Sequence, residues 1–158
     1  MFNPKLSRAV QSYQVSFETV VPAPRARAWA ALTAEVADWW PRHFFNHPDP
    51  VGFVVEGGIG GRVYEDWGDG AGYLFGTVVV WVPERRMTWA CELYPDWTGP
   101  GRSYVTFELE EAEGGALVRV TDAGYCIAAP QAADGLGRGW GELVGYHFRG
   151  YVEATAGR

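Results

Sequence analysis

The segment that decides the fold begins with Gly60-Gly-Arg-Val-Tyr-Glu-Asp-Trp67 and continues through Gly76-Thr-Val-Val-Val-Trp81, Val105-Thr-Phe-Glu-Leu109 and Leu117-Val-Arg-Val-Thr-Asp-Ala-Gly-Tyr125. These runs are short and apolar, and glycine, proline or acidic turns separate them, as at Asp69-Gly70. Consecutive strands joined by tight turns pair in antiparallel fashion. The pattern therefore predicts strands over 51–56, 61–67, 72–82, 86–94, 102–110 and 116–125.

Helical segments are expected on both sides of these strands. Upstream, a frayed lead-in over 1–11 precedes a strand over 12–21, helices over 25–33 and 34–40, and a proline-rich loop over 41–50. Downstream, apolar residues recur at helical spacing, which predicts one long helix with an inward stripe. The stripe is made of Leu136, Trp140, Leu143, Val144, His147 and Tyr151. The fold class is α+β: a curved antiparallel sheet of six to seven strands around a long C-terminal helix, in a single domain over 1–158.

Composition excludes several classes of partner. A net charge of −6 argues against nucleic acid, which needs a basic surface. Lys/Arg clusters do not accompany an amphipathic stretch, and no apolar run is long enough to span a membrane, so no membrane partner is expected. Two cysteines, Cys91 and Cys126, without metal-ligand spacing, fit a reducing compartment, so a cytoplasmic protein is expected. Its expected state is a monomer or a homodimer.

A series of motifs runs along most of the chain: Pro24-x4-Trp29-x2-Leu32-Thr33, Trp39-Trp40, Gly60-Gly61-Arg62-x2-Glu65, Gly76-Thr-Val-x2-Trp81-x-Pro83-x2-Arg86-Met87-x-Trp89, Val105-x-Phe107, Gly115, Leu117-Val-Arg-Val120, Gly124-Tyr125 and Gly139-Trp140. The order and spacing of these motifs resemble the activator-of-Hsp90-ATPase-homologue-like family, within the group related to START lipid-transfer domains and polyketide cyclases. The resemblance covers about residues 13–153. It implies a helix-grip fold with an internal cavity, but no agreed role for Glu65, which matches a recurrent Gly-Gly-Arg-x-x-Glu pattern.

A cavity walled by aromatic rings is expected because Phe, Trp and Tyr make up 15% of the chain. Strand alternation and helical spacing turn Trp89, Phe107, Trp140 and His147 inward, so we predict that these four line one pocket.

Three polar residues are further candidates for this pocket. Asp122 lies on an otherwise apolar strand face, His147 lies in the apolar helix stripe, and Glu65 lies between Tyr64 and Trp67. Structural roles compete in each case, because buried polar groups are usually hydrogen-bonded. His147 is then a satisfied core histidine, Asp122 caps a strand end or pairs with an arginine such as Arg119, and Glu65 pairs with Arg62 or Arg86. The predicted ligand-binding residues are Glu65, Trp67, Trp89, Phe107, Asp122, Trp140 and His147.

Other chemistry has little support in the sequence. His43 and His47 have H-x3-H spacing, but Pro41 and Pro48 bracket them and only Asp49 or Asp38 offers a third ligand, so no metal and no cofactor are expected. The G-x-S-x-G signature of serine hydrolases is missing, and both cysteines lie on apolar strands, as inert core thiols do. No catalytic residue is therefore assigned.

Three hypotheses of function remain. The first is a non-catalytic protein that binds a small hydrophobic or aromatic molecule between sheet and helix. The second is an enzyme of the cyclase/aromatase or hydrolase kind, with His147, Asp122 and Glu65 as acid–base groups close together in the cavity. The third, which the family resemblance implies, is a chaperone-associated interaction module. The high Arg-to-Lys ratio and short chain point to a bacterial source, which weighs against the third.

Overall fold

The sheet is fully antiparallel, as predicted, and the computed structural model describes residues 9–94, 99–127 and 132–158. Seven strands lie in the order β1-β7-β6-β5-β4-β3-β2 in this part of the chain. Their bounds are β1 Gln11–Val21, β2 Gly52–Val55, β3 Arg62–Gly68, β4 Ala71–Val82, β5 Arg86–Leu93, β6 Gly101–Ala112 and β7 Gly115–Cys126. Of the predicted lead-in, residues 1–8 lie outside the described residues, and Gln11 already belongs to β1.

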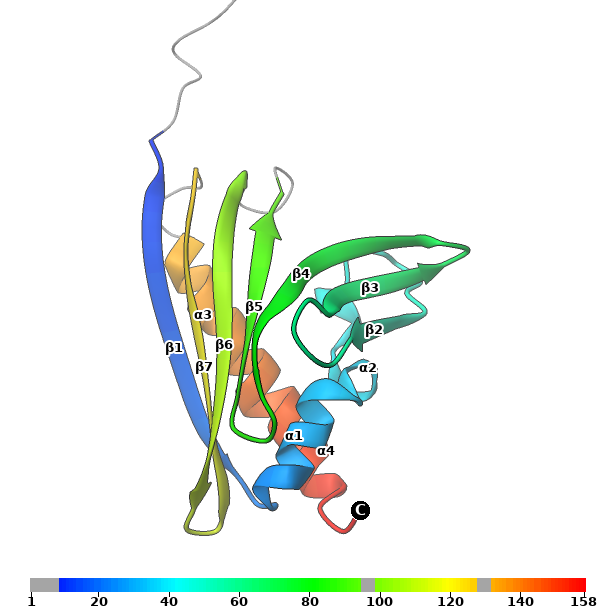
Figure 1. Ribbon diagram of the computed structural model, residues 1–158, viewed down its shortest axis with the longest axis vertical. Coiled ribbons are helices and arrows are strands. Elements are labelled where there is room, and N and C mark those ends of the chain that lie inside the picture. The colour runs from blue at the N-terminus through cyan, green and yellow to red at the C-terminus, as the bar shows by residue number, and fades with distance from the viewer. Residues whose placement is uncertain (1–8, 95–98, 128–131) are drawn as a thin grey trace, which may run out of the picture.

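Curvature comes from irregularities in strand pairing. Register shifts occur between Val78 and Val80 on β4, and between Val63 and Tyr64 on β3. An extra residue on one strand bends that strand and increases its twist. Figure 1 shows the result: β1, β7, β6 and β5 stand side by side, whereas β4, β3 and β2 curl away over the helices.

The helices lie on the concave face of this sheet (Figure 1). Helix α1 (Arg25–Thr33) and the short α2 (Val36–Trp39) follow β1, and a 3-10 turn, η2 (Arg42–Phe44), begins the 41–50 loop. The C-terminal helix runs without a break through α3 (Ala132–Glu142), a π-helical segment η3 (Leu143–Phe148) and α4 (Arg149–Ala154). This arrangement is the expected helix-grip fold.

Glycines let the C-terminal helix approach β1 closely. A Cβ on Gly145 would lie 2.6 Å from Cζ of Phe17, and one on Gly137 would already touch Val15. The helix backbone therefore lies close against the sheet.

The π-helical segment changes which residues of this helix face the core. Trp140, Leu143 and Val144 are buried as predicted, but beyond them the buried positions are Phe148 and Val152 instead of His147 and Tyr151. A π-helix closes its hydrogen bonds between residues five apart, so its wider turn rotates the following side chains relative to α-helical spacing. The prediction of the inward stripe is wrong for His147 for this reason, whereas Tyr151 is partly buried and still packs against the core.

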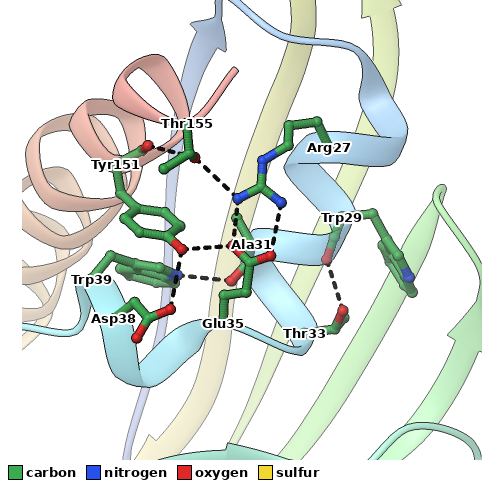
Figure 2. A network of polar contacts seen from close by, with 9 residues as sticks. All are labelled: Arg27, Trp29, Ala31, Thr33, Glu35, Asp38, Trp39, Tyr151 and Thr155. Carbon is green, nitrogen blue, oxygen red and sulfur yellow. Dashed lines mark hydrogen bonds and ion pairs between the residues drawn. The ribbon is translucent and has the colours of Figure 1, made fainter. Parts of the chain in front are cut away.

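A polar network fastens α1 to the end of the C-terminal helix (Figure 2). Buried Arg27 donates from Nη1 to Oε1 of Glu35 over 2.8 Å and from Nη2 to Thr155 Oγ1 over 3.0 Å. The Tyr151 hydroxyl donates to Glu35 Oε2 over 2.7 Å. The bond to Arg27 lowers the pKa of Glu35 to about 2, and burial raises the pKa of Tyr151 to about 12. The network ties the two helices together by charge-assisted bonds.

None of the helices in the described part of the chain has the length and apolar character needed to cross a membrane.

Candidate functional site

A cavity of about 210 Å³ lies between α3 and the concave face of the sheet. Strands β4, β5, β6 and β7 form one wall, α3 forms the opposite wall, and Trp40 with Phe44 closes one side. Most lining groups are aromatic or aliphatic. They are Trp40, Phe44, Tyr73, Phe75, Cys91, Glu92, Leu93, Ser103, Val105, Asp122, Gly135, Leu136, Gly139, Trp140 and Leu143.

One polar group in the wall, Asp122, has its hydrogen bonds filled by the protein. Its Oδ2 accepts from Trp140 Nε1 over 2.9 Å, and its Oδ1 accepts from Ser103 Oγ and from Tyr13 Oη, the latter over 3.1 Å. Burial raises the pKa of Tyr13, and the neighbouring Asp122 carboxyl raises it further, so the phenol stays a donor. Asp122 thus fixes the Trp140 ring in the cavity wall. Arg119, the partner considered from sequence, pairs with Glu18 over 3.0 Å instead.

Trp40 brings a polar group of another kind. Its side chain lines the cavity and is buried, and its indole N–H has no hydrogen-bond acceptor among the residues that the structure describes. A buried donor without an acceptor costs about 1–3 kcal/mol, so such groups call for an explanation.

The 41–50 loop contributes Phe44 to the cavity wall and is anchored at two points. On one side Glu65, fully buried on β3, accepts bonds from the backbone N–H of Asn46 over 2.9 Å and from Asn46 Nδ2 over 2.8 Å. On the other side His43 Nε2 lies 2.7 Å from Oε1 of Glu142 on α3. Phe44, between these anchors, reaches the cavity.

His147 completes a small cluster at the second anchor. Its Nε2 lies 3.5 Å from the same Glu142 oxygen, and one ligand atom from each of His43, Glu142 and His147 lies within 4.8 Å of the others. The hydrogen bond from His43 lowers the pKa of the Glu142 carboxyl. His47, the other half of the H-x3-H spacing, lies elsewhere: its ring stacks on Trp67 at 5.0 Å.

The predicted pocket residues separate into three groups. Trp140 and Asp122 line the cavity. Trp89 and Phe107 do not line it; they are buried and pack against each other, with 4.9 Å between their ring centroids. Their strands face inward as predicted, but other side chains cover them.

The third group lies outside the cavity and consists of Glu65, Trp67 and His147. Trp67 donates from Nε1 to Glu65 over 2.9 Å, so this pair belongs to the first anchor of the loop and neither Arg62 nor Arg86 pairs with Glu65 there. His147 belongs to the second anchor, because the π-helical turn carries it out of the inward stripe. The expectation that Trp89, Phe107, Trp140 and His147 line one pocket is therefore wrong for this cavity, where Trp140 alone of the four is in the wall.

The geometry also separates the three acid–base candidates. Glu65, Asp122 and His147 share no hydrogen-bonding or ionic partner within the described part of the chain, and only Asp122 reaches the cavity. Acid–base catalysis needs its groups within reach of one substrate. The trio proposed for a cyclase- or hydrolase-like enzyme is thus not assembled.

Several lining residues escaped sequence reasoning. Cys91 and Leu93 were not among the predicted ligand-binding residues, but they share the inward parity of Trp89 on β5, and that signal could have found them. Burial raises the pKa of the Cys91 thiol, as expected for an inert core cysteine. Trp40, the C-cap of α2, and Phe44, in the 3-10 turn η2, belong to elements too short to show a periodic signal.

Comparison with known proteins identifies the family. The model of the family "Activator of Hsp90 ATPase homolog 1-like protein" matches residues 22–153. Among curated proteins, none is similar enough in sequence to match this chain.

Solved structures share the fold at low identity. Protein MLL2253 from Mesorhizobium loti aligns with a TM-score of 0.69 and 20% identity over 90% of this chain and 98% of its own. DynU16, from the dynemicin biosynthetic locus, aligns with a TM-score of 0.67 and 22% identity over 90% of this chain and 48% of its own. CalU16 from Micromonospora echinospora aligns with a TM-score of 0.62 and 18% identity over 92% of this chain and 83% of its own. With the family match over most of its length, the chain belongs to the Activator of Hsp90 ATPase homolog 1-like protein family.

Proposed function

We propose that this protein binds a small apolar or aromatic molecule in the cavity between α3 and the sheet, without catalysing a reaction. The observation that carries the proposal is the cavity itself: about 210 Å³ lined by rings and aliphatic groups, beside a closely packed core. Small-molecule sites are typically concave and mostly apolar, with a few polar groups, and this cavity has that character.

The volume indicates the size of the ligand. An apolar cavity of about 150 Å³ in another protein holds benzene. A space of about 210 Å³ therefore suits a molecule of one or two fused rings. Aromatic ligands also match the walls, because Trp40, Phe44 and Trp140 offer ring faces and edges for stacking.

The polar groups indicate where the ligand carries oxygen. Asp122 already accepts three bonds from the protein, so a cationic group on the ligand gains little there. The free donor is the indole N–H of Trp40, which lacks an acceptor in the described residues. A ligand with one carbonyl, ether or hydroxyl oxygen would satisfy that donor, so an aromatic ring with an oxygen substituent is the class proposed.

Calorimetric titration with 1-naphthol and 1-methylnaphthalene tests the proposal. We expect one site per chain, a negative heat-capacity change from apolar burial, and tighter binding of 1-naphthol because it alone can accept from Trp40. Leu136→Trp places a large ring at the cavity wall and should abolish binding without lowering the melting temperature.

Tyr146→Trp is the matched control, because it adds the same ring to the same helix at an exposed position, 73% accessible to solvent. It should bind both probes as the wild type does. Equal binding to the wild type and Leu136→Trp, or no binding of either probe to the wild type, would overturn the proposal.

A further inference from the structure

We propose that His43, Glu142 and His147 form a binding site for a divalent transition-metal ion such as Zn²⁺. The proposal is independent of the ligand cavity. Sequence spacing offered only His43 with His47, so the site arises from the fold, which brings a loop residue to two residues of the C-terminal helix.

The distances suit a small ion. Ligand atoms that lie 2.0–2.1 Å from a tetrahedral zinc ion are about 3.3 Å apart from one another. Here Glu142 Oε1 lies 2.7 Å from His43 Nε2 and 3.5 Å from His147 Nε2, and all three ligand atoms lie within 4.8 Å. Small side-chain rotations therefore bring all three to coordination distance.

The π-helical segment is the second observation that points to this site. Glu142 and His147 are five residues apart, and in a regular α-helix their side chains would point about 140° away from each other. The π-helix begins at Leu143, directly after Glu142, and its i to i+5 periodicity brings the two side chains to one face. Such segments are often found at functional sites, because they are less stable than the α-helix that they interrupt.

The chemistry of the three groups fits a metal of this class. Imidazole nitrogen and carboxylate oxygen are ligands for zinc and for other late first-row ions, and two histidines with one carboxylate leave a position open for water or a further ligand. The side chains of His43, Glu142 and His147 are 62%, 45% and 25% exposed, so an ion can reach them from solvent.

A bound ion would strengthen the second anchor of the 41–50 loop. His43 immediately precedes Phe44, which lines the cavity, and Glu142 immediately precedes Leu143, which also lines it. Coordination by both elements would hold the loop against the C-terminal helix. Metal binding then raises the stability of the folded chain, since an ion that binds only the folded state shifts unfolding by mass action.

Calorimetric titration of untagged, chelator-stripped protein with Zn²⁺ tests the site. We expect one ion per chain and a rise in melting temperature with Zn²⁺. His43→Gln, Glu142→Gln and His147→Gln should each weaken binding by about 100-fold or more, because loss of even an outer-shell partner costs 10–100-fold.

His47→Gln is the matched control, since it removes a histidine from the same loop that stacks on Trp67 and lies outside the cluster. It should bind Zn²⁺ as the wild type does, and each variant is first shown to melt cooperatively. Binding of less than one ion, equal loss in His47→Gln, or unchanged binding in His147→Gln would overturn the proposal.

Discussion

Asp122 shows how a single buried residue can look catalytic in sequence and act as a support in the structure. Its carboxyl group accepts from Trp140, Ser103 and Tyr13, which come from α3, β6 and β1. Three elements therefore meet at one side chain, and the Trp140 ring in the cavity wall is oriented by it.

Replacing Asp122 should lower stability more than an ordinary surface change. Asp122→Ala leaves three buried or half-buried donors without an acceptor, and we expect the free energy of unfolding to fall by about 3 kcal/mol in urea denaturation. Asp134→Ala, at an exposed position of α3, should change it by less than about 0.5 kcal/mol. Similar small effects for both variants would show that Asp122 is not a structural support.

Glu35 should make stability depend on pH in acid. Its pKa is about 2 in the folded protein, against an ordinary value of 4.5, so below pH 4.5 the unfolded chain binds more protons at this group. The stabilisation that the Glu35 carboxylate provides is complete when the pH is above its ordinary pKa of 4.5, and it is lost as the pH falls toward 2.

Comparison of the wild type with Glu35→Gln isolates this contribution. At pH 7 the variant should be less stable by about 2 kcal/mol, because Arg27 loses its charged partner. Urea denaturation at a series of pH values should show that this difference shrinks as the pH falls from about 5 to 3. A difference that stays constant over that range would mean that Glu35 does not titrate as the Arg27 contact implies.

At the scale of elements, the C-terminal helix depends on where its glycines lie. A Cβ at Gly141 would make ordinary contact with Phe17 at 3.7 Å, whereas one at Gly145 would lie 2.6 Å from the same ring. The two positions therefore separate helix propensity from steric fit.

Gly141→Ala and Gly145→Ala should shift stability in opposite directions. The first gains helix propensity and should raise the free energy of unfolding by about 0.5–1 kcal/mol. The second forces Phe17 to move and should lower it by about 1 kcal/mol, since overpacking costs about 1–3 kcal/mol before any gain in propensity. Thermal and urea denaturation of both variants measure this, and a stabilised Gly145→Ala would contradict the tight contact with β1.

The strands were predictable from sequence because each is decided locally. Period-2 alternation and the Asp69-Gly70 turn predicted the antiparallel order, and the inward parity of Trp89, Phe107 and Asp122 agrees with their burial. Parity states which face a side chain takes, but it does not state whether that side chain meets a cavity or is covered by another residue. Trp89 and Phe107 are covered, so they were misplaced in the predicted pocket.

The remaining parts of the site depend on tertiary structure. An α-helical repeat put His147 in the inward stripe, and nothing local in the sequence marked the π-helical turn that moved it. The 41–50 loop takes its position from contacts with distant residues, Glu65 on β3 and Glu142 on α3, so the entry of Phe44 into the cavity wall had no local signal.

At the scale of the whole molecule, the fold divides its concave face into two parts. Trp89, Phe107 and Phe148 fill one part as close-packed core, and Arg27 with Glu35 ties the helices together beside it. The other part is left open between α3 and the strands, where Trp40 and Phe44 close one side. We propose that the ligand binds in that open part.

The most direct measurement is a crystal structure of the protein soaked with 4-bromo-1-naphthol, with the bromine located by anomalous scattering. The account predicts one strong bromine peak inside the cavity among Trp40, Phe44 and Trp140, with the naphthol oxygen at hydrogen-bond distance from the Trp40 indole nitrogen. Bromine on the outer surface only, or a cavity that stays empty at a concentration at which calorimetry shows binding, would contradict it.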